Sequence, residues 1–223
     1  MKSRRWIDGK RTGSRVINRK ETNMQENGSP MKVEITSGLP GPAPITGDVM
    51  VFSTFSVLFC GNILGWFGES ATFTIGVLQL SLAGLFFAGA RERCKYATFW
   101  GNMNLIFAFY FGVLGGATNV LAGLGFGLDG TVLAIPNLIA GLVLCGTLPG
   151  ARRDPWTFFI LYALAAVAVL FLGLGGLGIL AGVLYPVAAV CLGVVGVLGT
   201  YAVICNVNAC SGVNMPYGRP LFK

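Results

Sequence analysis

Long apolar blocks, separated by short links, make up most of the sequence after residue 47. A helix needs about 20 apolar residues to cross the roughly 30 Å hydrocarbon core of a bilayer. The blocks close to this length are residues 49–67, 71–90, 97–117, 130–148, 156–174 and 182–206. Each run is continuous, whereas strands of a membrane barrel alternate over about 10 residues. The sequence therefore predicts an all-α membrane protein with six transmembrane helices.

The basic residues fall on one side of the predicted spans. Of the 16 Lys and Arg residues, nine lie in residues 1–47, and the rest lie after the second, fourth and sixth spans. The intervening links carry only the acidic residues Glu69 and Asp129. Because basic residues next to spans stay in the cytosol, both termini are predicted to be cytosolic. An even number of spans also requires the termini to share a side.

Composition and charge divide the chain into three predicted parts. Residues 1–47 form a basic, Pro-ended tail that is poorly ordered in part, residues 48–208 form the six-helix domain, and residues 209–223 form a C-terminal tail. Only 11% of the residues are charged and 54% are hydrophobic, which disfavours a soluble enzyme and a disordered chain. The net charge of +7 comes mainly from the tail, so we expect no nucleic-acid partner.

The residues needed for common catalytic and metal sites are scarce. The chain has no histidine, and its six cysteines form no C-x-x-C pair. A catalytic triad, a histidine proton relay and a locally spaced zinc site therefore lack their usual residues. We expect no enzyme activity, no catalytic residue, no cofactor and no metal.

Neutral polar residues are spread through the predicted spans, and Thr54, Gln79 and Asn104 are among them. Such groups can replace the hydration of a small polar solute, or they can form hydrogen bonds between helices. Asp48 lies at the start of the first span, either as a proton-coupling carboxylate or as an acid stabilised at a helix N-terminus. No other acid or base falls within a predicted span, which argues against a buried carboxylate relay.

Glycines recur at the spacing that allows helices to pack closely in lipid. They are Gly61 and Gly65, Gly112 and Gly116, Gly178 and Gly182, and Gly193, Gly196 and Gly199. The spacing is compatible with packing within one subunit and with packing between subunits.

Four short segments follow one another along residues 41–222. They are Gly41-Pro42-Ala43-Pro44-Ile45, Gly76-Val77-Leu78-Gln79-Leu80, Gly146-Thr147-Leu148-Pro149-Gly150-Ala151-Arg152 and Tyr217-Gly218-Arg219-Pro220-Leu221. In order and spacing they resemble the signatures of the acetate uptake transporter family. The resemblance implies a six-helix channel or transporter for acetate or similar small carboxylates, succinate included, with linked proton uptake. It also implies a homo-hexamer in which each subunit has its own path.

The resemblance further implies site residues. The entrance motif is Gly41, Pro42, Ala43 and Pro44. Aligned without gaps, the Phe, Tyr and Leu of the family's apolar constriction correspond to Met50, Trp100 and Leu161, and Gln79 corresponds to a glutamine that faces the substrate. Phe52 would restore the phenylalanine, but two residues along a helix rotate a side chain by about 200°. Together with Asn104 and Thr54, these residues form the predicted substrate path.

Two transport routes and three functions remain open at this point. The solute crosses either as the neutral acid with its own proton, or as the anion held by amide and hydroxyl donors. The missing charge relay favours the neutral acid. A non-transporting structural or scaffold subunit is an alternative, because Gly41 replaces the family's asparagine and the tail is long and basic. A channel for another small solute, such as ammonia or water, is a weaker one.

The expected partners are a small carboxylate, protons, membrane lipid and further copies of the chain. The plasma membrane is the expected location, with an organellar membrane as the alternative.

Overall fold

The computed structural model describes residues 46–95, 97–213 and 215–220, all of which belong to one compact unit. The entrance motif and nearly all of the predicted N-terminal tail lie outside these residues.

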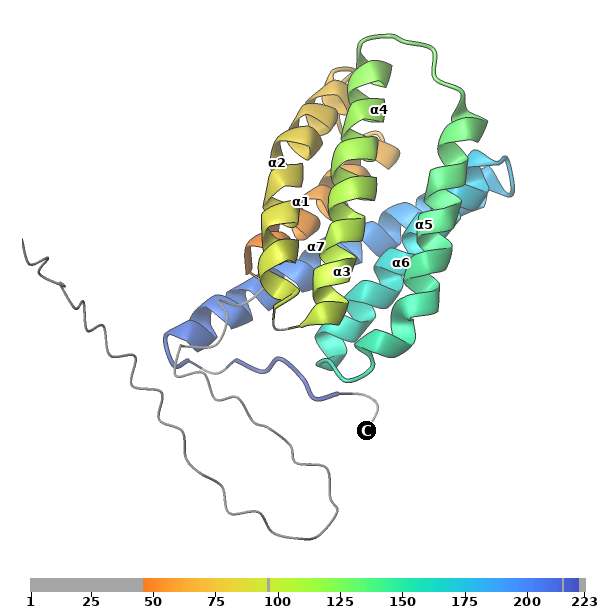
Figure 1. Ribbon diagram of the computed structural model, residues 1–223. Coiled ribbons are helices and arrows are strands. Elements are labelled where there is room, and N and C mark those ends of the chain that lie inside the picture. The colour runs from red at the N-terminus through yellow and green to blue at the C-terminus, as the bar shows by residue number, and fades with distance from the viewer. Residues whose placement is uncertain (1–45, 96, 214, 221–223) are drawn as a thin grey trace, which may run out of the picture. The chain divides into compact units, whose positions relative to one another are not determined.

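The described residues are helical, apart from short links, an extended C-terminal segment and one isolated bridge between Pro155 and Pro220. The elements are α1 (Thr46–Ile63), α2 (Ala71–Arg93), α3 (Thr98–Ile106), the π-helix η1 (Phe107–Leu114), α4 (Gly115–Gly123), α5 (Gly130–Ala151), α6 (Trp156–Gly176) and α7 (Ala181–Cys210) (Figure 1). The elements α3, η1 and α4 form one continuous helical segment, Thr98–Gly123.

Among the described residues, five helical segments are long and apolar enough to cross a membrane: α2, α3–η1–α4, α5, α6 and α7. The expectation of an all-α membrane protein is therefore confirmed. Helix α1 is apolar but shorter, over Gly47–Ile63. Its role as a sixth span, and the side on which the termini lie, stay predictions.

The observed helices differ from the predicted spans mainly at their ends. Helix α1 stops at Ile63 and not at Phe67, because Gly65 adopts a positive φ of 72° and the chain turns back. The segment that ends in α4 continues to Gly123, where Gly125 makes the corresponding turn. Helix α2 extends through Arg93, three residues beyond the predicted end, so that this basic residue belongs to the helix.

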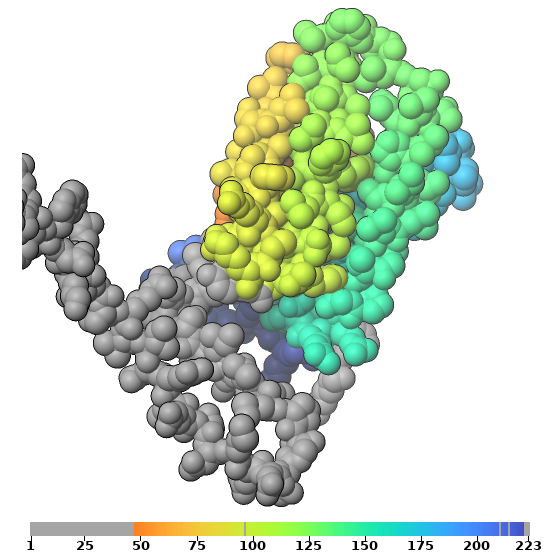
Figure 2. All heavy atoms as spheres, viewed as in Figure 1, coloured from red at the N-terminus to blue at the C-terminus, as the bar shows by residue number. Residues whose placement is uncertain are grey.

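The helices pack in a series that follows their contacts. The α3–η1–α4 segment packs on α2, α2 on α1, α1 on α7, α7 on α6, and α6 on α5 (Figure 1). The first and last members of this series are joined by a hydrogen bond from Tyr110 of η1 to Asn137 of α5. The series therefore closes into a ring, one face of which, formed by α2, α3–η1–α4 and α5, is visible in Figure 2.

Several glycines allow the helix backbones to approach one another closely. A Cβ added at Gly141 of α5 would lie 2.5 Å from the backbone of α6, and one at Gly116 of α4 would lie 2.9 Å from the backbone of α2. A Cβ at Gly193 of α7 would lie 3.1 Å from a cysteine sulfur of α1. These glycines therefore bring helices together within one chain. A Cβ at Gly182 would meet nothing within 4 Å.

We expect Gly141→Ala to destabilise the protein by about 1–3 kcal/mol, because a methyl group there forces the α5 and α6 backbones apart. The matched control is Gly84→Ala in α2, where a Cβ would meet no atom within 4 Å. Thermal unfolding of both variants in detergent measures the difference. Equal melting temperatures would contradict the close packing of α5 on α6.

Candidate functional site

Two of the cavities among the described residues lie between helices of the ring and are lined by residues of the predicted substrate path. The larger has a volume of about 220 Å³ and is lined by polar groups that include Gln79, Tyr110, Thr118, Asn119 and Asn137. We call it the amide cavity. It takes residues from the beginning of α5 and the end of α6. Its volume is several times the roughly 30 Å³ that one water molecule occupies in the liquid, so it has room for a small solute.

The smaller cavity, of about 30 Å³, lies in the opposite half of the ring. It takes residues from the beginning of α1 and α6 and from the end of α2. Its charged and polar lining residues are Asp48, Arg93 and Asn104. We call it the ion-pair cavity. In this conformation it has room for about one water molecule.

Gln79 joins α2 to the π-helical segment at the wall of the amide cavity. Where π-helical bonding returns to α-helical bonding, two carbonyls compete for one N–H group. The Gln79 Nε2 donates to the carbonyl of Phe111 in this last π-helical turn, at 2.7 Å, and the Asn119 Nδ2 donates to the Gln79 Oε1, at 2.7 Å. An amide nitrogen carries two hydrogens, so Gln79 retains a donor for a solute in the cavity.

The opposite wall of the amide cavity is also polar. Tyr110 of η1 donates to the side-chain oxygen of Asn137 on α5. Pro136 lies next to Asn137 inside α5 and has no N–H group, so the carbonyl one turn earlier lacks its usual donor. The cavity therefore combines amide and hydroxyl groups with apolar walls, which suits a small solute that has both polar and apolar parts.

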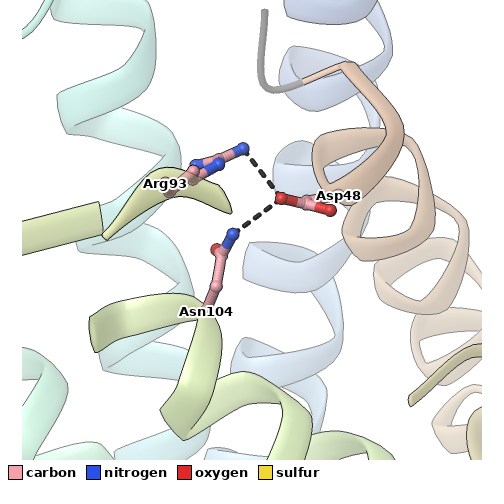
Figure 3. A network of polar contacts seen from close by, with 3 residues as sticks. All are labelled: Asp48, Arg93 and Asn104. Carbon is pink, nitrogen blue, oxygen red and sulfur yellow. Dashed lines mark hydrogen bonds and ion pairs between the residues drawn. The ribbon is translucent and has the colours of Figure 1, made fainter. Parts of the chain in front are cut away.

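The ion-pair cavity contains a charge pair in a largely buried setting (Figure 3). The Arg93 Nη2 lies 3.0 Å from the Asp48 Oδ2, and the two side chains are only 11% and 13% exposed. The Asn104 Nδ2 donates to the same carboxylate oxygen at 2.6 Å. Asp48 is therefore neither solvated nor isolated at the start of α1.

Five phenylalanines, Phe52, Phe55, Phe59, Phe107 and Phe111, lie between the two cavities, and we call them the aromatic partition. Phe52 and Phe107 line the ion-pair cavity, and their ring centroids are 5.0 Å apart. Phe59 and Phe111 line the amide cavity, with centroids 5.3 Å apart. Phe52 and Phe111 face different cavities and are 6.1 Å apart, so their rings join the two pairs.

The structure brings together three of the predicted path residues and leaves two outside. Trp100, Asn104 and Leu161 line the ion-pair cavity, whereas Gln79 lines the amide cavity.

Met50 is 50% exposed, and Thr54 is exposed and donates to the Met50 carbonyl at 2.9 Å. Phe52 stands at the cavity in place of Met50, because α1 begins at Thr46 in a register that turns Phe52 inward and Met50 outward. Phe52, and not Met50, therefore occupies the inward position that the gapless alignment gives to Met50.

Trp100 is held in place by neighbouring rings and by an acid. Its centroid lies 5.5 Å from those of Phe158 and Tyr162, both of α6, in edge-to-face geometry. Its indole also donates a hydrogen bond to Asp154, in the link before α6. Burial raises the pKa of Asp154 above its ordinary value, and this hydrogen bond partly offsets the rise.

Two further motif segments also touch the walls of the ion-pair cavity. The hydroxyl groups of Thr147 and Tyr162 are 2.6 Å apart, which ties the Gly146–Arg152 segment to a lining residue. The C-terminal segment lies across the start of α6, where Thr157 donates to the Tyr217 carbonyl at 2.8 Å. The Tyr217 ring packs on Phe158, another lining residue, with centroids 5.9 Å apart.

Sequence reasoning missed the Asp48–Arg93 pair and most of the aromatic partition. It ended the second span before Arg93, although a basic residue in the last turn of a span is a common feature of helix ends. Of the five phenylalanines, only Phe52 enters the sequence analysis, as a candidate for the constriction. The spacing of Phe52, Phe55 and Phe59 places all three on one helix face and could have revealed the inward side of α1.

Comparisons with known proteins show no family for this chain. No protein-family model matches it, and no curated protein sequence matches it. The two cavities, the aromatic partition and the four motif segments are therefore the features from which a function can be inferred.

Proposed function

We propose that the protein is a membrane transporter or channel for acetate or similar small carboxylates, with succinate as a further candidate. The observation that carries the proposal is the pair of cavities on either side of the aromatic partition, within one ring of helices. Polar groups in each cavity can replace the water around a solute, and the apolar rings between them oppose the passage of water and ions. The four motif segments support a carboxylate as the solute.

The partition favours transport of the neutral acid. A carboxylate loses much of its hydration energy in an apolar environment, and the five rings offer no charge to compensate it. A protonated acid passes the same rings at far lower cost. Transport linked to a proton therefore accounts for an apolar barrier between two polar cavities.

Large apolar side chains on the outside of the ring support contact with lipid. Leu85 and Phe87 of α2 are 51% and 60% exposed, and Phe109 of η1 is 78% exposed. By the motif resemblance we further propose a homo-hexamer with one path in each subunit, located in the plasma membrane. Lipid and neighbouring subunits would then cover these exposed side chains.

The first test is uptake of labelled acetate into liposomes that contain the purified protein, with an imposed pH gradient. We expect saturable uptake driven from the acidic side, slower as the pH of that side rises, because the neutral acid becomes scarcer. Propionate should compete. No flux above that of empty liposomes, from a folded oligomer, would overturn the proposal and favour a structural subunit.

The partition has its own test in Phe52→Ala. Removing this ring opens the contact between the two cavities, so we expect faster uptake of propionate and butyrate relative to acetate. Met50→Ala is the matched control, because Met50 lies two residues away on the same helix and points outward. Wider selectivity in the Met50 variant alone would show that the barrier lies elsewhere.

Gln79 tests the amide cavity. We expect Gln79→Ala to slow acetate uptake about tenfold, because a buried hydrogen-bonding group contributes roughly 1–3 kcal/mol. Ser81→Ala serves as the control, since this serine is on the same helix, is exposed and bonds only to its own helix backbone at 2.8 Å. Uptake is measured per folded protein, as judged by size-exclusion chromatography. Equal rates for the two variants would remove Gln79 from the path.

A further inference from the structure

The side chain of Asp48 resembles acetate held on a tether. Beyond its Cα, an aspartate consists of a CH₂ group and a carboxylate, which is acetate with one hydrogen replaced by the bond to the chain. In this structure that group is inserted into the ion-pair cavity, where Arg93 and Asn104 both contact its Oδ2 at 3.0 and 2.6 Å (Figure 3). The cavity therefore already holds a carboxylate of the proposed substrate class.

The surroundings of this carboxylate fit it closely. On the α2 side it lies against Gly89, where an added Cβ would overlap its oxygens. The absence of a side chain at this position leaves the space that the carboxylate fills. Phe52, Phe107 and Leu161 line the same cavity and provide apolar surface for an alkyl group.

Arg93 has unused binding capacity. A guanidinium carries five N–H donors and prefers to hold a carboxylate through two parallel hydrogen bonds. Its buried Nη2 makes the ion pair with Asp48 but no hydrogen bond of good geometry to any described residue. A free carboxylate is not bonded to the chain, so its orientation is unrestricted and it can accept two parallel hydrogen bonds from the Arg93 guanidinium.

Space for a solute appears only when Asp48 moves out. The ion-pair cavity has about 30 Å³ in the present conformation, enough for roughly one water molecule. Asp48 lies in the first turn of α1, where the positive end of the helix dipole still stabilises its charge after it has moved outward. Arg93 would meanwhile keep a partner in the incoming carboxylate, so no buried charge is left unpaired.

We propose that Arg93 and Asn104 form a carboxylate-binding subsite, that Asp48 occupies this subsite in the substrate-free protein, and that a small monocarboxylate displaces Asp48 from it. The inference deepens the proposed transport function and depends on it. Arg93 is the one cation among the described residues that line the cavity, and most of the other lining residues are apolar. A second carboxylate on the solute would therefore lack a partner, so the subsite selects acetate and propionate over succinate.

The experiment measures acetate binding to the purified full-length chain by titration calorimetry, alongside uptake into liposomes. We expect Asp48→Asn to tighten acetate binding about tenfold, because the competing carboxylate is removed while its shape is kept. Arg93→Gln should weaken binding by about tenfold or more, since hydrogen bonds to charged groups are the strong ones. Succinate should bind the wild-type protein more weakly than acetate.

The chain offers a matched control in the exposed pair Glu92–Lys95, at the same end of α2. Its atoms are 2.7 Å apart and both side chains are 57% exposed. Glu92→Gln and Lys95→Gln change the same charges outside the cavity, and we expect neither to change acetate affinity. The double variant Asp48→Asn/Arg93→Gln removes both buried charges together, so we expect it to fold. Its acetate affinity should be as low as that of Arg93→Gln alone, because the cation of the subsite is missing.

Each outcome separates the two proposals. Wild-type affinity in Asp48→Asn and Arg93→Gln, or no acetate binding to the wild-type protein, would overturn the subsite. If Glu92→Gln changed acetate affinity as much as Asp48→Asn does, the effect would reflect surface charge alone, and the subsite would also be overturned. Binding that follows the expected order without any flux would leave the subsite standing and overturn the transport function.

Discussion

The hydrogen bond from Gln79 to the Phe111 carbonyl supports the π-helical segment η1, whose residues line both cavities. Inside a bilayer no water is available for a free backbone carbonyl, so an irregular turn survives only where protein groups satisfy it. The π-helical turn of η1 is such a place, and Gln79 and Asn119 close it from α2 and α4. The same turn orients Phe111 toward Phe52 and Phe59, which are part of the aromatic partition.

The two cavities differ in the kind of polar group they contain, and this difference has a physical meaning. Neutral amides and hydroxyls line the larger cavity, whereas a cation and an anion lie in the smaller one. A buried ion pair is costly to assemble but far more costly to break by removing one member. An anion that replaces Asp48 avoids that cost, whereas a neutral solute does not. In the proposed transport, one solute would therefore bind as the anion in the smaller cavity and pass the aromatic partition as the neutral acid.

Much of the fold follows from the sequence, because long continuous apolar blocks favour helices in lipid. The ends of the helices were harder to predict. Gly65 ends α1 through a positive φ, and hydropathy does not distinguish such a glycine from one inside a span. The gapless alignment places Met50 inward, whereas the positions of Phe52, Phe55 and Phe59 contain the information that turns the helix the other way. The pairing of Asp48 with Arg93 depends on tertiary packing between α1 and α2, which no local pattern encodes.

The order in which the helices are synthesised differs from the order in which they pack. Helix α1 packs between α2 and α7, and α7 is the last helix among the described residues. The wall of the ion-pair cavity at Phe158 is in turn covered by Tyr217, close to the end of the chain. The face of α1 that packs on α7 therefore stays without its partner until α7 has been synthesised. The smaller cavity is accordingly completed late in biosynthesis, because the α6 residues that line it and the Tyr217 ring that packs on one of them are made after α1 and α2.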